Sequence, residues 1–159
     1  MKAMVVFDSA YGNTEKIARA IGEALGSRLD VEIHRVSDIR PESVVGSELL
    51  LVGSPTQGFR PTKPVAEFLK RLRVSGLAGT RVAAFDTRFK AQEIRSGALR
   101  LLVRTGGFAA ERIAAQLKKA GGNLIVSPEG FFVEDTEGPL KPGELERAAE
   151  WARSILGAV

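Results

Sequence analysis

The sequence predicts an α/β protein: a three-layer, doubly wound domain built on a five-stranded parallel sheet. Two observations support this prediction. Short apolar runs alternate with longer segments in which apolar residues recur at helical spacing, from one end of the chain to the other. The apolar runs have few polar residues on either face, which is typical of parallel strands covered on both sides. We expect the whole chain, residues 1–159, to form one such domain.

Five apolar runs are the predicted strands, at residues 3–8, 30–37, 47–54, 80–86 and 123–127. Segments with helical periodicity follow four of them, at residues 13–28, 62–73, 108–122 and 142–156. Pro64 lies in the first turn of the second helix, where its missing N–H has no intrahelical partner to lose. The last helix is predicted to turn one apolar stripe inward, formed by Leu145, Ala148, Ala149, Ala152 and Ile155.

The segment at residues 90–107 fits this alternation less well. Its apolar residues are interleaved with Arg95, Arg100 and Arg104, as in a short basic amphipathic helix. The first interpretation is a segment that packs over the edge of the sheet. The alternative is a contact with a partner, a second copy of the chain or a membrane surface.

Composition excludes several kinds of chemistry. The chain has no cysteine, which removes dithiol exchange, thiolate nucleophiles and Cys-ligated metal clusters. Its one histidine, His34, alternates with apolar residues in a strand pattern and is expected at the strand surface. Any redox chemistry must therefore come from a bound cofactor. With no apolar run of roughly 18 residues and no signal-peptide pattern, we expect no transmembrane segment and a cytoplasmic location.

The positive charge is concentrated in the middle of the chain. Residues 1–59 contain six basic and eight acidic side chains, residues 60–119 fourteen and four, and residues 120–159 three and seven. The corresponding net charges are −2, +10 and −4, within a total of +4. The central block indicates either an ordinary solvated surface or a preference for an anionic ligand, an acidic partner or nucleic acid.

The loop at residues 9–14 joins the first predicted strand to the first predicted helix. It is not a P-loop, because the Gly-Lys-Ser/Thr ending is absent, and Gly12 is its only glycine, so it is not a GxGxxG fingerprint. Free N–H groups and the helix dipole favour an anion at such a position, and the Ser, Asn and Thr side chains add neutral donors. The loop suits a phosphate monoester; a simple N-cap and turn is the alternative.

Two further loops follow predicted strands at the same edge of the sheet. Residues 52–61, VGSPTQGFRP, contain small residues that let the backbone approach a flat ligand, and Phe59, which could stack on it. Residues 85–90, FDTRFK, place Phe89 beside Arg88. Ligands of open α/β sheets bind outside the carboxyl ends of the strands, so the three loops together favour a binding site over a simple cap.

At these residues the sequence resembles the flavodoxin family. SAYGNTE is similar to that family's flavin phosphate loop, S-x-T-G-N-T-E, and GSPTQG and FDTR occupy the positions of the loops on the two faces of the flavin ring. EGPLKPGELERAAEWA resembles the carboxyl-terminal part of flavodoxin-like proteins of bacteria and archaea. The resemblance covers essentially the whole chain. It implies strand order 2-1-3-4-5, non-covalent FMN, and a fifth strand without a long insertion.

Carried over residue by residue, the resemblance implies three groups of FMN-binding residues. The group that holds the phosphate is Ser9, Ala10, Tyr11, Gly12, Asn13 and Thr14. The group on one face of the isoalloxazine ring is Ser54, Pro55, Thr56, Gln57, Gly58 and Phe59. The group on the other face is Asp86, Thr87, Arg88 and Phe89. No catalytic residue and no metal ligand is implied, and capping a turn is favoured over acid–base catalysis for Asp86.

Two departures from the family pattern predict weaker FMN binding than in typical flavodoxins. Tyr11 stands where the family usually has threonine, so one hydroxyl contact is lost. The usual Trp and Tyr that enclose the ring are missing, and Phe59 and Phe89 take their place.

The charge beside the ring loops is opposite to that of typical flavodoxins, which are acidic. Arg60, Arg88 and Lys90 form a predicted basic rim in or next to these loops. The rim should raise the semiquinone/hydroquinone potential of bound FMN above that of acidic family members. It should also bind a redox partner protein with an acidic docking surface, and salt should weaken this binding. The implied function is electron transfer between redox partners.

Two other functions stay open on the sequence alone. One is an NAD(P)H- or quinone-dependent FMN reductase on the same fold, with Arg60 and Arg88 holding the phosphates of the nicotinamide cofactor. The other is a flavin-free basic module for RNA or an acidic protein. The second lacks interleaved aromatic residues and any recognised nucleic-acid motif, so we expect no nucleic-acid partner. The sequence makes no prediction of the oligomeric state.

Overall fold

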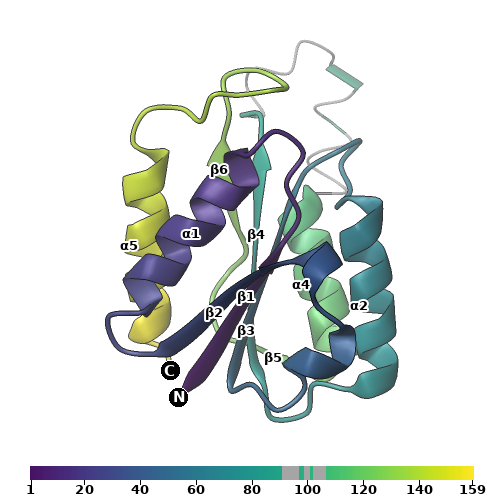
Figure 1. The fold of residues 1–159 in the computed structure, drawn as a ribbon. Coiled ribbons are helices and arrows are strands. Elements are labelled where there is room, and N and C mark those ends of the chain that lie inside the picture. Colours follow the sequence, from purple (N-terminus) through teal and green to yellow (C-terminus); the bar gives the residue numbers. More distant parts are fainter. Residues whose placement is uncertain (91–96, 99–100, 102–106) are drawn as a thin grey trace.

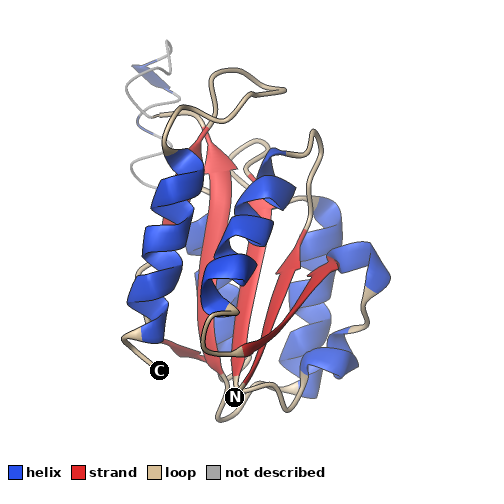
Figure 2. Ribbon diagram, turned by 60° about the vertical axis from the view of Figure 1, so that its left-hand side comes forward, coloured by secondary structure: helices blue, strands red, loops and turns tan. Residues whose placement is uncertain are grey.

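A computed structural model describes residues 1–90, 97–98, 101 and 107–159, which form a parallel sheet between helices (Figures 1 and 2). The strands are β1 (Lys2–Phe7), β2 (Asp30–Arg35), β3 (Leu49–Pro55), β4 (Arg81–Arg88), β5 (Asn123–Leu124) and β6 (Glu129–Phe132). The helices are α1 (Asn13–Leu25), α2 (Lys63–Ser75), α4 (Ala109–Lys119) and α5 (Glu144–Leu156). The predicted amphipathic segment at residues 90–107 lies almost entirely outside the described residues.

The strands are ordered β2-β1-β3-β4-β5, and all their pairings are parallel. This order confirms the predicted doubly wound α/β fold. Helices α1 and α5 cover one face of the sheet, and α2 and α4 cover the other (Figure 1). The carboxyl ends of the parallel strands therefore meet at one edge, where the predicted binding loops also lie.

Alternate residues of the central strands supply two separate cores. In β1, Met4 and Val6 pack toward α2 and α4, whereas Val5 and Phe7 pack toward α1 and α5. Strands β3 and β4 repeat this alternation with buried Leu, Val, Ala and Phe side chains. Because both faces are covered, a strand of this kind appears in the sequence as a continuous apolar run.

The predicted fifth strand, residues 123–127, is shorter in the structure, where β5 ends at Leu124, and β6 begins beyond the predicted range, at Glu129. β5 pairs with Arg81 and Val82 of β4 and then stops, and β6 resumes the pairing with residues 85–88. Pro128 lies between the two pieces and has no N–H to donate to a neighbouring strand. Among the described residues the sheet contains six strands. β4 continues as strand through Arg88, where a loop was predicted, and its last four residues pair with β6.

The inward face of α5 is rotated relative to the predicted stripe. Leu145 is 42% exposed and Ala149 is half-buried, whereas Trp151 is buried. The Trp151 ring meets Phe85 and Phe131 edge-on, with centroids 6.1 Å from each. The buried face of α5 therefore includes Trp151 together with Ala148, Ala152 and Ile155 of the predicted stripe, and a count of aliphatic positions missed the aromatic residue.

Candidate functional site

A hollow opens at the carboxyl edge of the sheet, where the predicted loops converge. Its lining comes from the loops after β1, β3 and β6 and from the end of β4: Ser9, Ala10, Tyr11, Asn13, Thr14, Pro55, Thr56, Gln57, Thr87, Arg88, Phe89, Val133 and Thr136. Eleven of the sixteen residues predicted to bind FMN are in this lining. The fold therefore brings most of the three predicted groups together.

The loop after β1 leads directly into α1. Gly12 precedes the helix with a φ of 92°, in the left-handed region that glycine adopts without strain. Ser9 Oγ accepts hydrogen bonds from the N–H groups of Gly12 at 3.0 Å and Glu15 at 3.4 Å. Within the described part of the chain, nothing accepts a hydrogen bond from the N–H of Ala10 or Tyr11. These two groups, at the positive end of α1, are available to an anion.

Arg35, at the end of the edge strand β2, fixes the start of this loop. Its Nη1 donates to the carbonyl of Ser9 at 3.0 Å and lies 3.5 Å from Asp8 Oδ1, and its Nη2 donates to Glu15 Oε1 at 2.9 Å. Hydrogen bonds from Arg19 and Arg35 hold the pKa of Glu15 below its ordinary value. Sequence reasoning missed Arg35, because it is 26 residues from Ser9 and only the pairing of β1 with β2 brings them together.

The first turn of α1 is also tied to the other side of the hollow. The hydroxyls of Thr14 and Thr87 lie 2.8 Å apart in a buried hydrogen bond. Asn13 Nδ2 donates to the carbonyl of Glu137, in the loop after β6, at 3.1 Å. Gly138 packs so closely on Asn13 that an added Cβ would lie 2.6 Å from Nδ2. The helix start, the end of β4 and the loop after β6 thus form one connected wall.

The loop after β3 closes in a tight turn. Gln57 and Arg60 exchange two backbone hydrogen bonds, at 2.8 and 3.1 Å. Both central residues have positive φ, 55° for Gly58 and 65° for Phe59, as in a type I′ turn. A bulky residue rarely adopts this conformation. Gln57 lines the hollow, whereas Phe59 does not.

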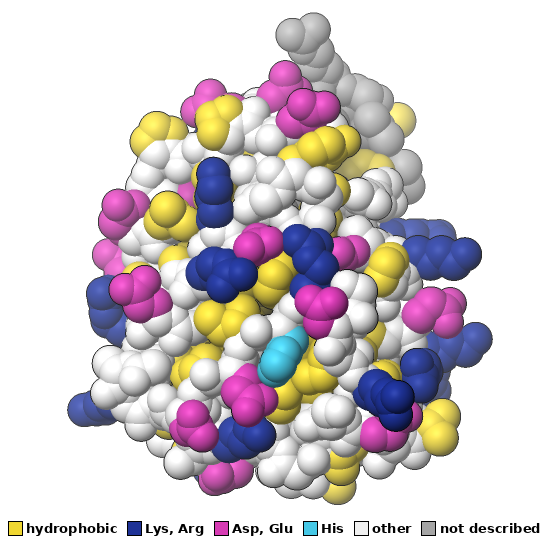
Figure 3. All heavy atoms as spheres, viewed as in Figure 1, with side chains coloured by type: hydrophobic (Ala, Val, Ile, Leu, Met, Phe, Trp, Pro, Cys, Tyr) yellow, Lys and Arg dark blue, Asp and Glu magenta, His cyan; other side chains and the backbone are white. Residues whose placement is uncertain are grey.

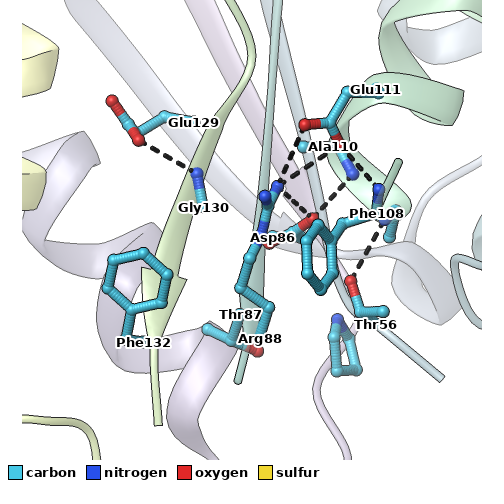
Figure 4. A network of polar contacts seen from close by, with 12 residues as sticks. Thr56, Asp86, Thr87, Arg88, Phe108, Ala110, Glu111, Glu129, Gly130 and Phe132 are labelled. Carbon is cyan, nitrogen blue, oxygen red and sulfur yellow. Dashed lines mark hydrogen bonds and ion pairs between the residues drawn. The ribbon is translucent and has the colours of Figure 1, made fainter. Parts of the chain in front are cut away.

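The end of β4 directs its charged side chains toward α4 (Figure 4). Asp86 is fully buried and accepts hydrogen bonds from Arg88 Nε at 2.6 Å, from Arg88 Nη2 at 2.8 Å and from the N–H of Ala110 at 2.8 Å. Arg88 Nη2 also donates to Glu111 Oε2 at 3.3 Å. The guanidinium carbon of Arg88 lies 4.0 Å from the centroid of the Phe108 ring. The period of two along a strand puts Asp86 and Arg88 on this face and Thr87 on the face of Thr14.

This network corrects two expectations from the sequence. Asp86 has no exposed surface, so its side chain cannot cover the face of a flat ligand. Arg88 lines the hollow, but its charge is paired with Asp86 and Glu111, so it is not a free cation of a basic rim. Burial raises the pKa of Asp86 above its ordinary value, although Arg88 and the N–H of Ala110 oppose this shift.

The structure places five predicted residues outside the lining: Gly12, Ser54, Gly58, Phe59 and Asp86. Ser54 is buried, and its hydroxyl accepts a hydrogen bond from the N–H of Thr62 at the start of α2. Sequence reasoning in turn missed Val133 and Thr136. The signal that could have found them is the apolar run of β6 followed by the polar turn EDTEGP, the same strand-then-loop pattern as at the other strands.

Two aromatic side chains are in the lining, Tyr11 and Phe89. Tyr11 is 55% exposed and Phe89 is 37% exposed. Exposed aromatic side chains beside a hollow can stack on a flat ligand. The aromatic pair at the hollow is therefore Tyr11 with Phe89, where the sequence suggested Phe59 with Phe89.

The strand order, the free N–H groups at the start of α1 and the aromatic hollow at the edge of the sheet are those of a flavodoxin-like protein. The family model for flavodoxin matches residues 5–151. The chain therefore belongs to the flavodoxin family.

Two uncharacterised proteins of Methanocaldococcus jannaschii match part of the chain. One is 42% identical over 60 residues, which are 34% of this chain and 15% of that protein. The other is 38% identical over 74 residues, which are 43% of this chain and 19% of that protein. The matches thus cover less than a fifth of the length of these curated relatives.

Solved structures of low sequence identity share the fold. Oxidised flavodoxin 1 of Bacillus cereus has a TM-score of 0.80 at 15% identity and covers 100% of this chain and 99% of its own. A flavodoxin from the domain Archaea has a TM-score of 0.77 at 24% identity, with 99% and 97% covered. Rubredoxin oxygen:oxidoreductase of Desulfovibrio gigas has a TM-score of 0.75 at 20% identity, with 99% of this chain and 35% of that chain covered.

Proposed function

We propose that the hollow binds FMN non-covalently and that the protein carries electrons between redox partners. The observation behind this proposal is the pair of free N–H groups, on Ala10 and Tyr11, at the positive end of α1 and beside an aromatic hollow. A phosphate group suits the N–H groups, and a flat ring suits the side chains of Tyr11 and Phe89. Bound FMN supplies the redox chemistry, since it takes up and releases electrons one at a time.

The chain's own residues divide into those that contact FMN and those that support them. In the phosphate loop, Ala10 and Tyr11 donate N–H groups, while Gly12 and Ser9 shape the backbone. The proposed ring contacts are Pro55, Thr56, Gln57, Thr87 and Phe89. The proposed supporting residues are Asn13, Thr14, Ser54, Gly58, Phe59, Asp86 and Arg88.

The lining favours a carrier over an enzyme. Among its described residues, Tyr11 is the one side chain with a dissociable proton of the kind used in acid–base catalysis, and none is a carboxylic acid, a histidine or a lysine. The FMN reductase alternative used Arg60 and Arg88 for the phosphates of a nicotinamide cofactor. Pairing of Arg88 with Asp86 and Glu111 removes one of these two cations.

We further propose that the chain acts as one flavodoxin-like domain in the cytoplasm and exchanges electrons with a partner that has an acidic docking surface. Across the residues that the structure describes, no helix has the length and apolar character needed to cross a membrane. The excess of Lys and Arg at residues 60–119 supports attraction of an acidic partner.

The proposed function is tested with FMN-loaded protein. We expect dithionite-reduced protein to pass its electrons to cytochrome c in amounts that match the bound FMN. We also expect no steady-state oxidation of NADPH with a quinone acceptor unless a separate reductase is added. Sustained NADPH oxidation by the protein alone would assign it to the reductases, and absence of FMN binding would leave the flavin-free module.

A further inference from the structure

A groove runs between α2 and α4, on the face of the sheet away from α1 and α5. It is lined by four cations and by small apolar residues, including Arg60, Lys70, Arg73, Arg112, Ala66 and Ala115. No acidic residue is among its described lining residues. In Figure 3, Lys and Arg side chains gather on the right-hand side of the molecule, which is the side on which α2 lies in Figure 1. The groove is separate from the hollow at the sheet edge.

Small side chains on facing helices create the groove. Ala66 on α2 and Ala115 on α4 are both exposed, and their methyl groups are too short to fill the space between the helices. Leu69, which is only 2% exposed, forms part of the floor. The long apolar stems of Lys70 and Arg73 rise beside it, with their charges in solvent. The groove thus combines an apolar floor with cationic edges.

The four cations of the groove are unpaired. Within the described part of the chain, no carboxylate lies within ion-pair distance of any of them. Some exposed arginines elsewhere have partners, since Arg71 Nη2 lies 3.6 Å from Glu42 Oε1 and Arg19 Nη2 lies 3.0 Å from Glu15 Oε2. What sets the groove apart is that four cations without such a partner among the described residues line one depression. Like charges around one groove repel each other, so an anionic partner relieves repulsion and adds attraction at the same time.

The mouth of the proposed FMN site is acidic on one side and basic on the other. Glu134, Asp135 and Glu137 are exposed on the loop after β6, and Asp and Glu side chains are seen at the top of Figure 3. On the α2 side lies Arg60, which belongs both to the turn after β3 and to the groove. An acidic partner is therefore repelled from the β6 side and attracted toward α2.

We propose that the groove between α2 and α4 docks an acidic segment of the redox partner. Carboxylates of the segment pair with the four cations, and an apolar side chain rests between Ala66 and Ala115. This inference rests on the proposed electron-transfer function, because Arg60 connects the groove to the mouth from which electrons must leave. Nucleic acid fits less well, since none of the described lining residues is an aromatic side chain on which a base could stack.

Two double charge reversals test the proposal at equal net charge. Lys70→Glu with Arg73→Glu changes the groove, and both residues are exposed on α2. Arg28→Glu with Arg153→Glu changes two exposed arginines outside the groove, one in the turn between α1 and β2 and one on α5. Each pair lowers the net charge by four, so they differ only in where the charge changes.

The probe is a fluorescein-labelled synthetic peptide in which Glu residues flank Leu residues at helical spacing. Its binding is followed by fluorescence anisotropy at low salt. We expect the groove variant to raise the peptide Kd about tenfold or more and the control variant to change it less than about twofold. Replacing Leu by Ser in the peptide should weaken its binding to the unaltered protein by about fivefold or more, because the apolar contact is lost.

Several outcomes would overturn the proposal. Equal weakening by both double variants would show a response to net charge alone, and equal affinity for the Leu and Ser peptides would show that the floor is not used. If NADPH or a single-stranded RNA displaced the labelled peptide at a lower concentration than the unlabelled peptide does, the groove would be assigned to that other ligand. Absence of peptide binding would also reject it.

Failure of the proposed function is seen separately. Every variant is titrated with FMN, and the peptide measurement is made on both FMN-loaded and FMN-free protein. The groove variant should bind FMN as the unaltered protein does, because Lys70 and Arg73 are not in the lining of the hollow. An unaltered protein that binds the peptide but not FMN would contradict the carrier function while leaving the groove as an acidic-peptide site.

Discussion

The two polar segments at the hollow, residues 9–14 after β1 and residues 86–89 at the end of β4, differ in what their polar groups bind. In the first, the N–H groups of Ala10 and Tyr11 have no acceptor in the described part of the chain. In the second, Asp86 and Arg88 bind each other and the start of α4. A ligand can use only hydrogen-bonding groups that the protein leaves free. The first segment is therefore suited to binding, and the second to support.

The helices that begin near the hollow show the same contrast. The N–H groups of residues 108–110, at the start of α4, donate to Glu111, Thr56 and Asp86. In the loop before α1, side-chain oxygens accept from the N–H groups of Ser9 and Gly12, but in the described part of the chain none accepts from those of Ala10 and Tyr11. Both helices have a positive end, but the charge of α4 is already neutralised by protein groups. Of these two helices, as far as the structure describes the chain, only α1 presents free backbone N–H donors beside the hollow.

The largest effect should come from breaking the supporting segment. Arg88→Met leaves the buried Asp86 carboxyl without its partner, which should destabilise the fold by about 3–5 kcal/mol in urea unfolding. Combining it with Asp86→Asn should recover part of this loss, because a neutral amide is less costly to bury than an unpaired charge. If the double variant were as unstable as Arg88→Met alone, the loss of the Asp86–Arg88 ion pair would not explain the lower stability of Arg88→Met.

The next largest effect is expected on FMN binding, and it is tested by comparing a substitution at Gly12 with the same substitution at Gly46, which lies outside the lining of the hollow. Gly12 and Gly46 both have a φ of 92°, and an added Cβ would meet nothing within 4 Å at either position. Substitution by Val should strain each by about 1–2 kcal/mol. Only Gly12→Val should also weaken FMN binding, by about tenfold, because it displaces the loop N–H groups. Similar FMN affinities for the two variants, measured by flavin fluorescence, would contradict the proposed phosphate loop.

A smaller effect is expected at Arg35, which holds the phosphate loop without lying in the lining. Arg35→Gln removes the hydrogen bonds to the Ser9 carbonyl and to Glu15, so FMN affinity should fall by about fivefold, or roughly 1 kcal/mol. Arg19→Gln is the control, because it also removes a bond to Glu15 but leaves Ser9 untouched. If both variants bound FMN equally, Arg35 would have no role in positioning the loop.

The smallest effect is on the pH dependence of stability. The pKa of Asp86 is raised by burial above its unfolded value of about 3.9, so its contribution is fully present below that pH and is lost as the pH rises through the folded pKa. Asp86→Asn should therefore make the free energy of unfolding decline less as the pH rises from about 4. Urea unfolding across this range measures the slope, and an unchanged slope would contradict the prediction.

Glu144 is the contrasting group for that experiment. Burial opposes its ionisation, but hydrogen bonds from Arg147 and from the N–H of Phe132 hold its pKa below the ordinary value. Its contribution is therefore present above its unfolded pKa of about 4.3 and is lost as the pH falls through the folded pKa. Glu144→Gln should reduce the loss of stability as the pH falls. Asp86→Asn should instead reduce the loss of stability as the pH rises.

The sequence predicted what local patterns determine. Apolar runs and helical periodicity were enough for the doubly wound α/β class and for the loop at residues 9–14, because strands, turns and caps depend on near neighbours. The strand order is not local, and it was predicted only through the resemblance to the flavodoxin family. The roles of Asp86 and Arg35 depend on contacts 24 and 26 residues away in sequence, which no local pattern contains. The missed residues Val133 and Thr136 follow β6, and the break at Pro128 concealed that strand.

The central claim is that the free N–H groups at the start of α1 hold the phosphate of FMN. Titrating the protein with FMN and with riboflavin, while following flavin fluorescence, tests it most directly, since riboflavin has the same ring and no phosphate. We predict one-to-one binding of FMN that is about 100-fold tighter than that of riboflavin, because two charge-assisted hydrogen bonds are lost without the phosphate. Equal affinities for the two flavins would contradict the claim.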